Sequence, residues 1–403
     1  MYSKELVSAL AAFSIVSGVA AVGCKDDPVE INSQADATQA ANCETINNDV
    51  VVGTQAGSSI DLGGRLTEIK GSLIVKNNGL IQGLSSDSLE TIGGDFQLNN
   101  DTSLASVVFP NLGKVRSINW VTLPSLQEPT FGTPGITEAE SVLVADTFVS
   151  NLDGINVQDV TEMNINNNRR LSKFSTSIKT LSNLLQVNAN ALNMSMEMPN
   201  LEWIANMTIS NVSSFAVPSL KAVNGSMRFD SNYFTNFIAE NLTEIHDGDL
   251  SFVSNPQLQN ISIPLLKKVG GGVTIANNTD LGKVDGFDSL EDVGGAIKMR
   301  GSFDSIELPK LDNVVGTAEF VSTKNIDNSC EDLNKLSGSV VQGKVTACDS
   351  DIASANNDTD PASSGSGGSG GDNNDDSAAS LASVSMSTVV TLAALGGLVT
   401  AFL

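Results

Sequence analysis

The sequence predicts an all-β protein whose chain winds into a right-handed parallel β-solenoid. Three observations lead to this prediction. A frame that reads Leu-x-x-Ile/Val-x-Gly-x-aliphatic-x-aliphatic-x-Asn-Asn recurs along the chain, for example from Leu66 to Asn78. Apolar residues alternate within the frame, as at Leu73 and Val75, and this is the period of a β-strand. Repeats of about 20 residues are typical of solenoids, in which each repeat forms one coil.

The coils follow one another at intervals of 19 to 24 residues. Starts of the frame are Leu66, Leu89, Leu112, Ile136, Val160, Leu181, Leu201, Leu220, Leu242, Leu266, Leu290 and Leu311. About twelve strands spaced ~4.8 Å apart predict a rod roughly 55 Å long. A leucine-rich-repeat horseshoe is the alternative fold, because its repeat has a related frame. The stretches between the predicted strands show little helical period, so the β-solenoid is preferred.

Glycine and asparagine mark the ends of each predicted strand. Glycines that precede a strand are expected to permit a sharp turn of the backbone, and they are Gly71, Gly94, Gly225, Gly271 and Gly295. The Asn-Asn pair that follows the strand is expected to form ladders of hydrogen bonds between neighbouring coils. On this interpretation Asn100 and Asn277 are ladder residues.

Composition restricts the classes of partner. The formal net charge is −24, which argues against nucleic acid because phosphates require Lys and Arg. The same charge argues against peripheral binding to anionic lipid. Aromatic residues make up 5% of the chain, so the core is expected to consist of Leu, Ile and Val.

The first 21 residues are typical of a secretory signal peptide. Lys4 is followed by an apolar run from Leu6 to Val22 that ends in small residues, and cleavage is expected near Ala21. An alternative is a bacterial lipobox over residues 21–24, which would place a lipid on Cys24. That alternative leaves the C-terminal tail unexplained.

The last residues are typical of a signal for a glycosylphosphatidylinositol (GPI) anchor. Small residues at 377–379 are followed by a weakly polar spacer, residues 380–387, and by an apolar tail that ends at Leu403 without Lys or Arg. The predicted attachment residue is Ser377, with Asn374 and Asp376 as alternatives. A short membrane anchor kept in the mature protein is the competing interpretation.

Four cysteines flank the repeats. Cys24 and Cys43 precede them, and Cys330 and Cys348 follow them. Export favours disulfides, and four cysteines allow three connectivities. Local pairing would hold the two open ends of the solenoid. A metal site is not expected, since neither spacing fits a zinc motif and the chain has one histidine.

Nine sequons predict N-glycosylation of an exported chain. They lie at Asn100, Asn193, Asn206, Asn211, Asn224, Asn241, Asn260, Asn277 and Asn357. Sequons on ladder residues would escape glycosylation if they were buried. Asn241 and Asn357 lie off the expected ladder and are the preferred sites.

No residues form a motif for catalysis or for a cofactor. A Ser–His–Asp triad would need His246, but no nucleophile elbow is present. Four aspartates near predicted turns could form a carboxylate row of the kind that cleaves carbohydrate: Asp95, Asp101, Asp280 and Asp285. The preference of aspartate for turns explains them equally well. The sequence therefore predicts a protein that is not an enzyme.

The order of these features resembles the fungal cell-wall organisation proteins with receptor-L-domain-like repeats, a family that includes sporulation-specific and protoplast-secreted wall proteins. These features divide the chain into an expected signal peptide at 1–21, a cap with a cysteine pair at 22–65, repeats and a second cap at 66–348, a stalk at 349–377 and a removed propeptide at 378–403. The stalk is expected because a segment rich in Asp, Asn, Ser and Gly cannot bury enough apolar surface to fold.

The resemblance also implies a function. The expected protein is a non-enzymatic, GPI-anchored glycoprotein of the outer plasma-membrane face or the cell wall that supports wall organisation. Its expected partner is the plasma membrane, through the lipid, and wall glucan is a candidate partner. A receptor or adhesin that binds glycan or protein through the solenoid face is the first alternative, and a carbohydrate-active enzyme is the second.

Overall fold

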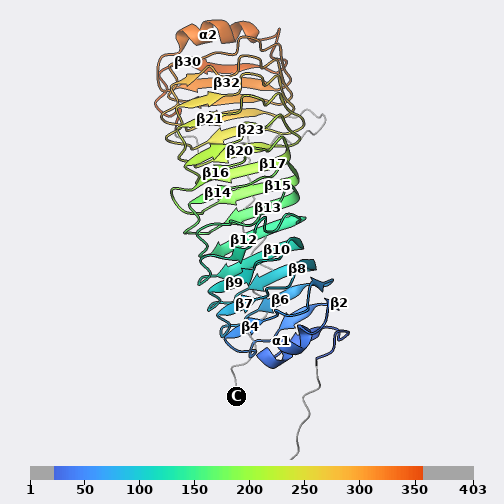
Figure 1. Cartoon of the computed structure of the whole chain (residues 1–403). Helices are drawn as coiled ribbons and strands as arrows, with labels where there is room; N and C mark the ends of the chain where they lie inside the picture. The colour runs from blue at the N-terminus through green and yellow to red at the C-terminus, as the bar shows by residue number, and fades with distance from the viewer. Residues whose placement is uncertain (1–21, 357–403) are drawn as a thin grey trace, which may run out of the picture. The chain divides into compact units, whose positions relative to one another are not determined.

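The described part of the chain, residues 22–356 of a computed structural model, forms a parallel β-solenoid of about 14 turns with about 5% helix (Figure 1). The predicted fold class is confirmed. The predicted signal peptide, the attachment residues and Asn357 lie outside the described residues. The structure has more turns than the repeat frame predicts, because residues 29–61 and 344–349 also contribute strands to the stack.

One large sheet of 22 strands runs the length of the solenoid. Its strands are β1 (Val29–Ile31), β2 (Thr45–Ile46), β3 (Val50–Val52), β5 (Glu68–Ile69), β6 (Leu73–Lys76), β8 (Thr91–Asn99), β10 (Lys114–Leu123), β12 (Ser141–Thr147), β13 (Asp159–Asn166), β15 (Thr180–Asn188), β17 (Trp203–Ser210), β19 (Ala222–Val223), β20 (Met227–Asp230), β22 (Glu244–Ile245), β23 (Leu250–Val253), β25 (Lys268–Val269), β26 (Val273–Ala276), β28 (Asp292–Val293), β29 (Ile297–Gly301), β31 (Asn313–Val314), β32 (Thr317–Ser322) and β33 (Lys344–Asp349). The pairings between these strands are parallel.

Shorter parallel sheets form a second side of the coils. They comprise β4 (Ser59–Asp61), β7 (Gly83–Ser85), β9 (Ser106–Phe109) and β11 (Thr130–Phe131); β14 (Lys173–Ser175), β16 (Ser195–Glu197) and β18 (Ser214–Ala216); β21 (Asn236–Ile238) and β24 (Asn260–Ser262); and β27 (Lys283–Val284) and β30 (Ser305–Ile306).

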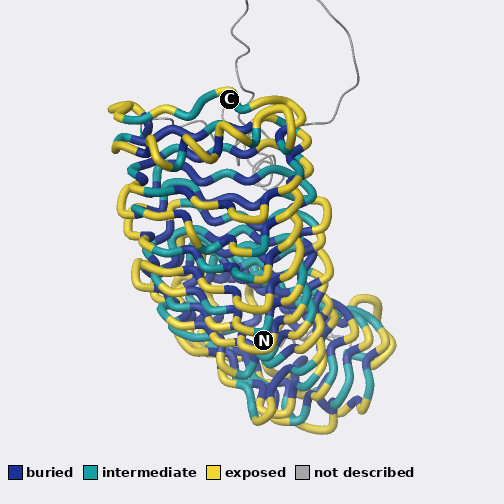
Figure 2. The backbone as a smooth tube through the Cα atoms, turned by 90° about the horizontal axis from the view of Figure 1, so that it is seen from above, coloured by how far each residue is buried: buried dark blue, intermediate teal, exposed yellow. Residues whose placement is uncertain are grey.

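The core lies between these two sides. Leu73, Val75 and Ile275 are fully buried, as the alternation predicts, while the residues between them face outward. Exposed residues gather at the corners of the coils (Figure 2). Leu, Ile and Val supply most of the core, but aromatic residues form two stacks within it. Trp120 packs edge-on against Phe96 at 5.6 Å, and Phe229 stacks on Phe252 at 4.8 Å.

The predicted hydrogen bonds between asparagine side chains of neighbouring coils are present, and the second residue of each pair forms the buried ladder. Asn100 and Asn277 have positive φ, 56° in each case, and they turn the chain out of the strand. The next residues, Asp101 and Asn278, are the buried members of the ladder. Asn100 and Asn277 still bond the preceding coil: the Nδ2 of Asn100 donates to the Oδ1 of Asn77 at 2.8 Å, and the Nδ2 of Asn277 donates to the Oγ of Ser254 at 3.0 Å. The sequence pattern does not fix which residue of the pair turns inward; the alignment of whole coils does.

Each ladder amide connects three coils. The Nδ2 of Asn232 donates to the carbonyl of Ile209 in the preceding coil and to the Oδ1 of Asn255 in the next. The Oδ1 of Asn255 also accepts the backbone N–H of Asn232 at 2.8 Å. Buried polar groups are therefore paired along the stack, as a low-dielectric core requires. The position is occupied by Asn78, Asp101, Thr147, Asn168, Asn190, Asn232, Asn255 and Asn278.

The glycines before the strands have a different role from the one predicted. None of the five has a positive φ, so the turn itself does not require glycine. Instead, the backbones of successive coils approach closely there. A Cβ on Gly295 would lie 2.7 Å from the nitrogen of Gly272 and 2.8 Å from the carbonyl carbon of Gly271. A side chain there would force the backbone of the neighbouring coil to shift.

A short helix closes each end, and each end carries a disulfide. At the N-terminal end, α1 (Gln34–Ala40) is capped by the side chain of Ser33, and Cys24 is bonded to Cys43. At the other end, α2 (Asp327–Leu333) and the 3-10 helix η1 (Asn334–Leu336) cover the last coil, and Cys330 is bonded to Cys348. Of the three possible connectivities, the structure has the local one.

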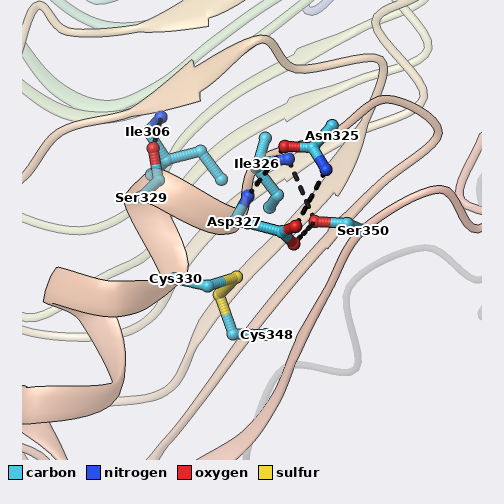
Figure 3. Close-up of a disulfide and its surroundings, with 8 residues drawn as sticks. All are labelled: Ile306, Asn325, Ile326, Asp327, Ser329, Cys330, Cys348 and Ser350. Atoms are coloured by element: carbon cyan, nitrogen blue, oxygen red, sulfur yellow. Dashed lines mark hydrogen bonds between the residues drawn. A yellow bond between two sulfur atoms is a disulfide. The ribbon is translucent and has the colours of Figure 1, made fainter.

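A cluster of hydrogen-bonded polar residues lies beside the C-terminal disulfide (Figure 3). The hydroxyl of Ser350 donates to Asp327 at 2.7 Å and accepts the N–H of Ile326. This hydroxyl, together with the amide of Asn325, lowers the pKa of Asp327. The chain beyond Cys348 also remains packed, since Ala355 is buried and Asn356 donates to Ser302 at 2.5 Å. The first eight residues of the predicted stalk thus lie against the final coils.

Candidate interaction surface

The residues that could have supported catalysis do not form a catalytic group. His246 is about half exposed in a turn, 3.7 Å from Asp247, and no serine hydroxyl bonds its ring within residues 22–356. Asp95 forms an ion pair with Arg116 at 2.8 Å on the outer face of the large sheet. Asp101 points the other way, into the ladder.

Asp280 and Asp285 are exposed and lie several coils from Asp95, so the four aspartates do not form a row. Burial raises the pKa of Asp101 to about 6, and the N–H groups of Asn78 and Asn99 that donate to its carboxylate oppose the shift. Its position between coils leaves it out of reach of a substrate. No group of three or more His, Cys, Asp or Glu side chains that could hold a metal occurs among the described residues.

The sequons are spread over several sides of the coils. The side chains of four are exposed: Asn100, Asn193, Asn224 and Asn241. Four more are half-buried: Asn206, Asn211, Asn260 and Asn277. Asn206 is held between coils, since its Oδ1 accepts the N–H of Ser226 and its Nδ2 donates to the carbonyl of Asn183. Asn241 remains a preferred site, because it is exposed at a corner.

The large sheet carries on its outer face a group of amide side chains that the sequence interpretation missed. We call it the amide strip, and it comprises Gln97, Asn99, Asn119, Asn164, Asn166, Gln186 and Asn188, on β8, β10, β13 and β15. These strands run from the lower part of the stack to its middle (Figure 1). All seven side chains are half-buried at the surface.

Strand register places these amides in two parallel rows. In the first row Gln97 pairs with Asn119, and Asn164 pairs with Gln186. Leu143 on β12 lies between those pairs, and Thr208 on β17 continues the row. In-register parallel strands thus repeat one type of side chain at intervals of ~4.8 Å along the solenoid axis.

The second row runs beside the first, two residues later on each strand. Asn99 pairs with Val121, and Asn166 pairs with Asn188. Ala145 lies between those pairs. The two rows are therefore neutral from β8 to β15, although the whole chain is strongly acidic.

Hydrogen bonds orient part of the amide strip. The Nδ2 of Asn166 donates to the Oδ1 of Asn164 at 2.6 Å, and the Nδ2 of Asn164 points toward the Oε1 of Gln186 at 3.5 Å. A chain of amides aligned in this way leaves donors and acceptors directed outward. Each amide has two N–H donors and a carbonyl acceptor, more than these contacts use.

Charged residues begin where the amide strip ends. On β20 the two rows continue as Arg228 and Asp230. Arg228 is bonded to Asp249 at 3.3 Å. Burial raises the pKa of Asp230, and the charge of Arg228 opposes that shift. At the other end, Lys76 on β6 continues the second row beside Asn99. The strip is therefore a neutral region with charged side chains beyond both of its ends.

The sequence contains a signal for this surface. The strip residues occupy the variable positions of the frame, on either side of the second inward aliphatic residue. That these positions carry amides on several coils can be recognised as one surface only when the strands are aligned in register.

The chain is similar in sequence to curated fungal proteins over most of its length. A cell surface GPI-anchored protein of Arthroderma benhamiae is 35% identical over 85% of this chain and 87% of its own length. Protein ecm33 of Aspergillus fumigatus is 34% identical over 89% of this chain and 88% of its own. The chain belongs to the fungal family of cell surface GPI-anchored proteins and ecm33 cell wall proteins. Sporulation-specific protein 2 of Saccharomyces cerevisiae, another member, is 34% identical over 78% of this chain, which spans 62% of that longer protein.

Family models and solved structures give no further match. No family model matches the chain, and no solved structure matches it. Residues 22–356 contain no helix long and apolar enough to cross a membrane. The family resemblance seen in the sequence is thus confirmed by the curated relatives.

Proposed function

We propose that this protein is a non-enzymatic glycoprotein of the fungal cell surface that supports organisation and integrity of the cell wall. The observation that carries the proposal is the extent of the relationship. Two relatives align with most of this chain and most of their own length, and one of them is named a cell surface GPI-anchored protein. A relative in Schizosaccharomyces pombe, 29% identical, is named a cell wall protein.

The fold supports a mechanical or display role. The coils share one continuous core, and ladder amides connect each coil to its neighbours. Stability in such an array depends on the contacts between adjacent repeats, so the solenoid behaves as one stiff element. Disulfides at both ends restrain the terminal coils, each of which has only one neighbouring coil.

The GPI anchor is the part of the proposal that can be tested most directly. We propose that the lipid is attached at Ser377, with Asn374 and Asp376 as alternatives, and that the apolar tail is removed. Phosphatidylinositol-specific phospholipase C should then release the protein from intact cells, and glucanase digestion in parallel should release any wall-linked fraction. Mass spectrometry that finds Leu403 still attached to the cell-derived protein would contradict the anchor.

A binding role is the second candidate, and the amide strip favours it. A receptor or adhesin needs an exposed surface of defined chemistry that its own glycans leave open. The amide strip supplies such a surface, since none of its asparagines lies in a sequon. A glycan array probed with the purified full chain distinguishes the candidates, because selective binding favours the receptor and its absence favours the purely mechanical role.

A further inference from the structure

We propose that the amide strip binds a chain of neutral polysaccharide that lies along the solenoid axis. This inference rests on the proposed function at the cell wall and names the ligand class and the surface. Three features of the strip support it: its periodicity, its chemistry and the absence of sequons on its asparagines.

The periodicity suits a polymer. One row offers an amide on four of the six coils from β8 to β17, with hydroxyl-bearing Thr208 at its end. A linear polysaccharide also presents the same groups at regular intervals, so a repeated row can contact several sugar units at once. Many weak contacts on one chain add as in multivalent binding.

The chemistry suits a neutral, hydroxyl-rich ligand. A hydroxyl both donates and accepts a hydrogen bond, and so does an Asn or Gln amide. The two rows carry no charge between β8 and β15, so an anionic polymer gains no ion pair there. A protein partner fits the strip less well. Hot spots in protein interfaces are enriched in Trp, Tyr and Arg, and the outward positions of these rows have none of these residues.

The chain's own glycans would leave the strip open. Residues two places after Asn119 and Asn164 are Val121 and Asn166, so neither asparagine lies in a sequon. The same holds for the other asparagines of the strip, whose second following residues are Asp101, Asn168 and Asn190. Nearby sequons at Asn100 and Asn211 follow the strands, at the corner of the coil. A third nearby sequon, Asn206-Met-Thr208, lies on β17, where the half-buried amide of Asn206 is hydrogen-bonded to the coils on both sides.

The test places a new glycan on the strip. Asn166→Thr completes an Asn-x-Thr sequon on Asn164 in the centre of the strip, and threonine is well suited to a strand. The matched control is Ile238→Thr, which completes a sequon on Asn236. That pair also occupies outward positions two residues apart on a strand, β21, but on the opposite side of the coils.

A second control separates the substitution from the glycan. The double variant Asn164→Gln/Asn166→Thr carries the threonine without a sequon. All proteins are full chains made in a yeast host, extracted in detergent, and checked by mass spectrometry for the added glycan and by circular dichroism for the fold. Binding is measured to particulate β-glucan, to chitin and to mannan, with polygalacturonate as an acidic comparison.

We expect the unmodified protein to bind at least one of the neutral polymers and to bind polygalacturonate at least tenfold less. The glycan on Asn164 should weaken neutral binding at least tenfold, while the control glycan on Asn236 should leave it within twofold. The double variant should retain more binding than Asn166→Thr. The proposal is overturned if no neutral polymer binds, if the Asn164 glycan has no effect, or if both glycans weaken binding equally.

Failure of this inference is distinguishable from failure of the proposed function. Phospholipase release and wall localisation are measured on the same variants. A variant that is displayed normally but no longer binds polysaccharide supports the inference. Normal display of an unmodified protein that binds no polysaccharide refutes the inference and leaves the surface role intact.

Discussion

Replacement of Asn255 by alanine should destabilise the solenoid more than any exposed change on the same coil. Asn255 is fully buried in the ladder. Its Oδ1 accepts two bonds from Asn232, at 2.8 Å from the backbone nitrogen and 3.0 Å from the Nδ2. Its Nδ2 donates at 3.0 Å to the carbonyl of Phe229 and at 3.0 Å to the Oδ1 of Asn278. Alanine removes all four bonds.

The magnitude follows from the groups left without a partner. A buried polar group that loses its hydrogen bond costs about 1–3 kcal/mol. Asn232 loses the acceptor of its backbone N–H, and water cannot replace it in a closed stack. Partial relaxation of the remaining amides reduces the sum, so we expect a loss of roughly 3–5 kcal/mol in the free energy of unfolding. That is a large share of the ~5–15 kcal/mol that stabilises a typical native protein.

The assay is urea unfolding of the purified full chain, followed by far-UV circular dichroism at neutral pH. Gln257→Ala is the matched control, since Gln257 is exposed on the same coil and should change the free energy by less than about 0.5 kcal/mol. Hydrogen exchange at the amide of Asn232 gives a local measurement. A loss below 1 kcal/mol for Asn255→Ala, or equal effects of the two variants, would refute the role assigned to the ladder.

Three further predictions concern Asp101, Gly295 and Ile275. Because the pKa of Asp101 is raised, the folded state holds a proton that the unfolded state releases near pH 3.8. The free energy of unfolding should therefore fall by about 2 kcal/mol as pH rises from about 4 to 6. Asp101→Asn should abolish that slope in a pH series of unfolding curves, and a slope that persists in the variant would point to another group. Gly295→Ala should lower the melting temperature by several degrees because its Cβ would meet backbone atoms, whereas Gly113→Ala, where nothing lies within 4 Å, should be nearly neutral; equal shifts would contradict the close approach. Ile275→Asp should prevent secretion of folded protein because it places a charge in the core, and unchanged yield would contradict the inward register.

Local periodicity was sufficient for much of the fold. The alternation at Leu73 and Val75 predicts that both side chains face inward, because successive side chains of a strand point to opposite sides. Repetition of that pattern predicts a stacked core, since one coil alone cannot bury its apolar side. Both predictions are confirmed by the burial of these residues.

Features that depend on contact between coils could not be derived in this way. The sequence cannot show whether the first or the second residue of an Asn-Asn pair enters the ladder, because both are compatible with a turn. Stacking decides it: Asn278 lies over Asn255 and is buried, whereas Asn277 takes the left-handed conformation. The role of Gly295 was likewise decided by a backbone in the neighbouring coil.

Sequence alone determined the repeat, the inward aliphatic residues and the family resemblance, because these depend on order along one chain. Only the tertiary structure decided which side chains form the amide strip. Asn164 and Gln186 are 22 residues apart, and they become neighbours only because two coils stack in register. A surface to which each coil contributes only one or two side chains is not visible as a local pattern. Hydrogen bonding between strands, rather than spacing in the sequence, sets which of these side chains are neighbours.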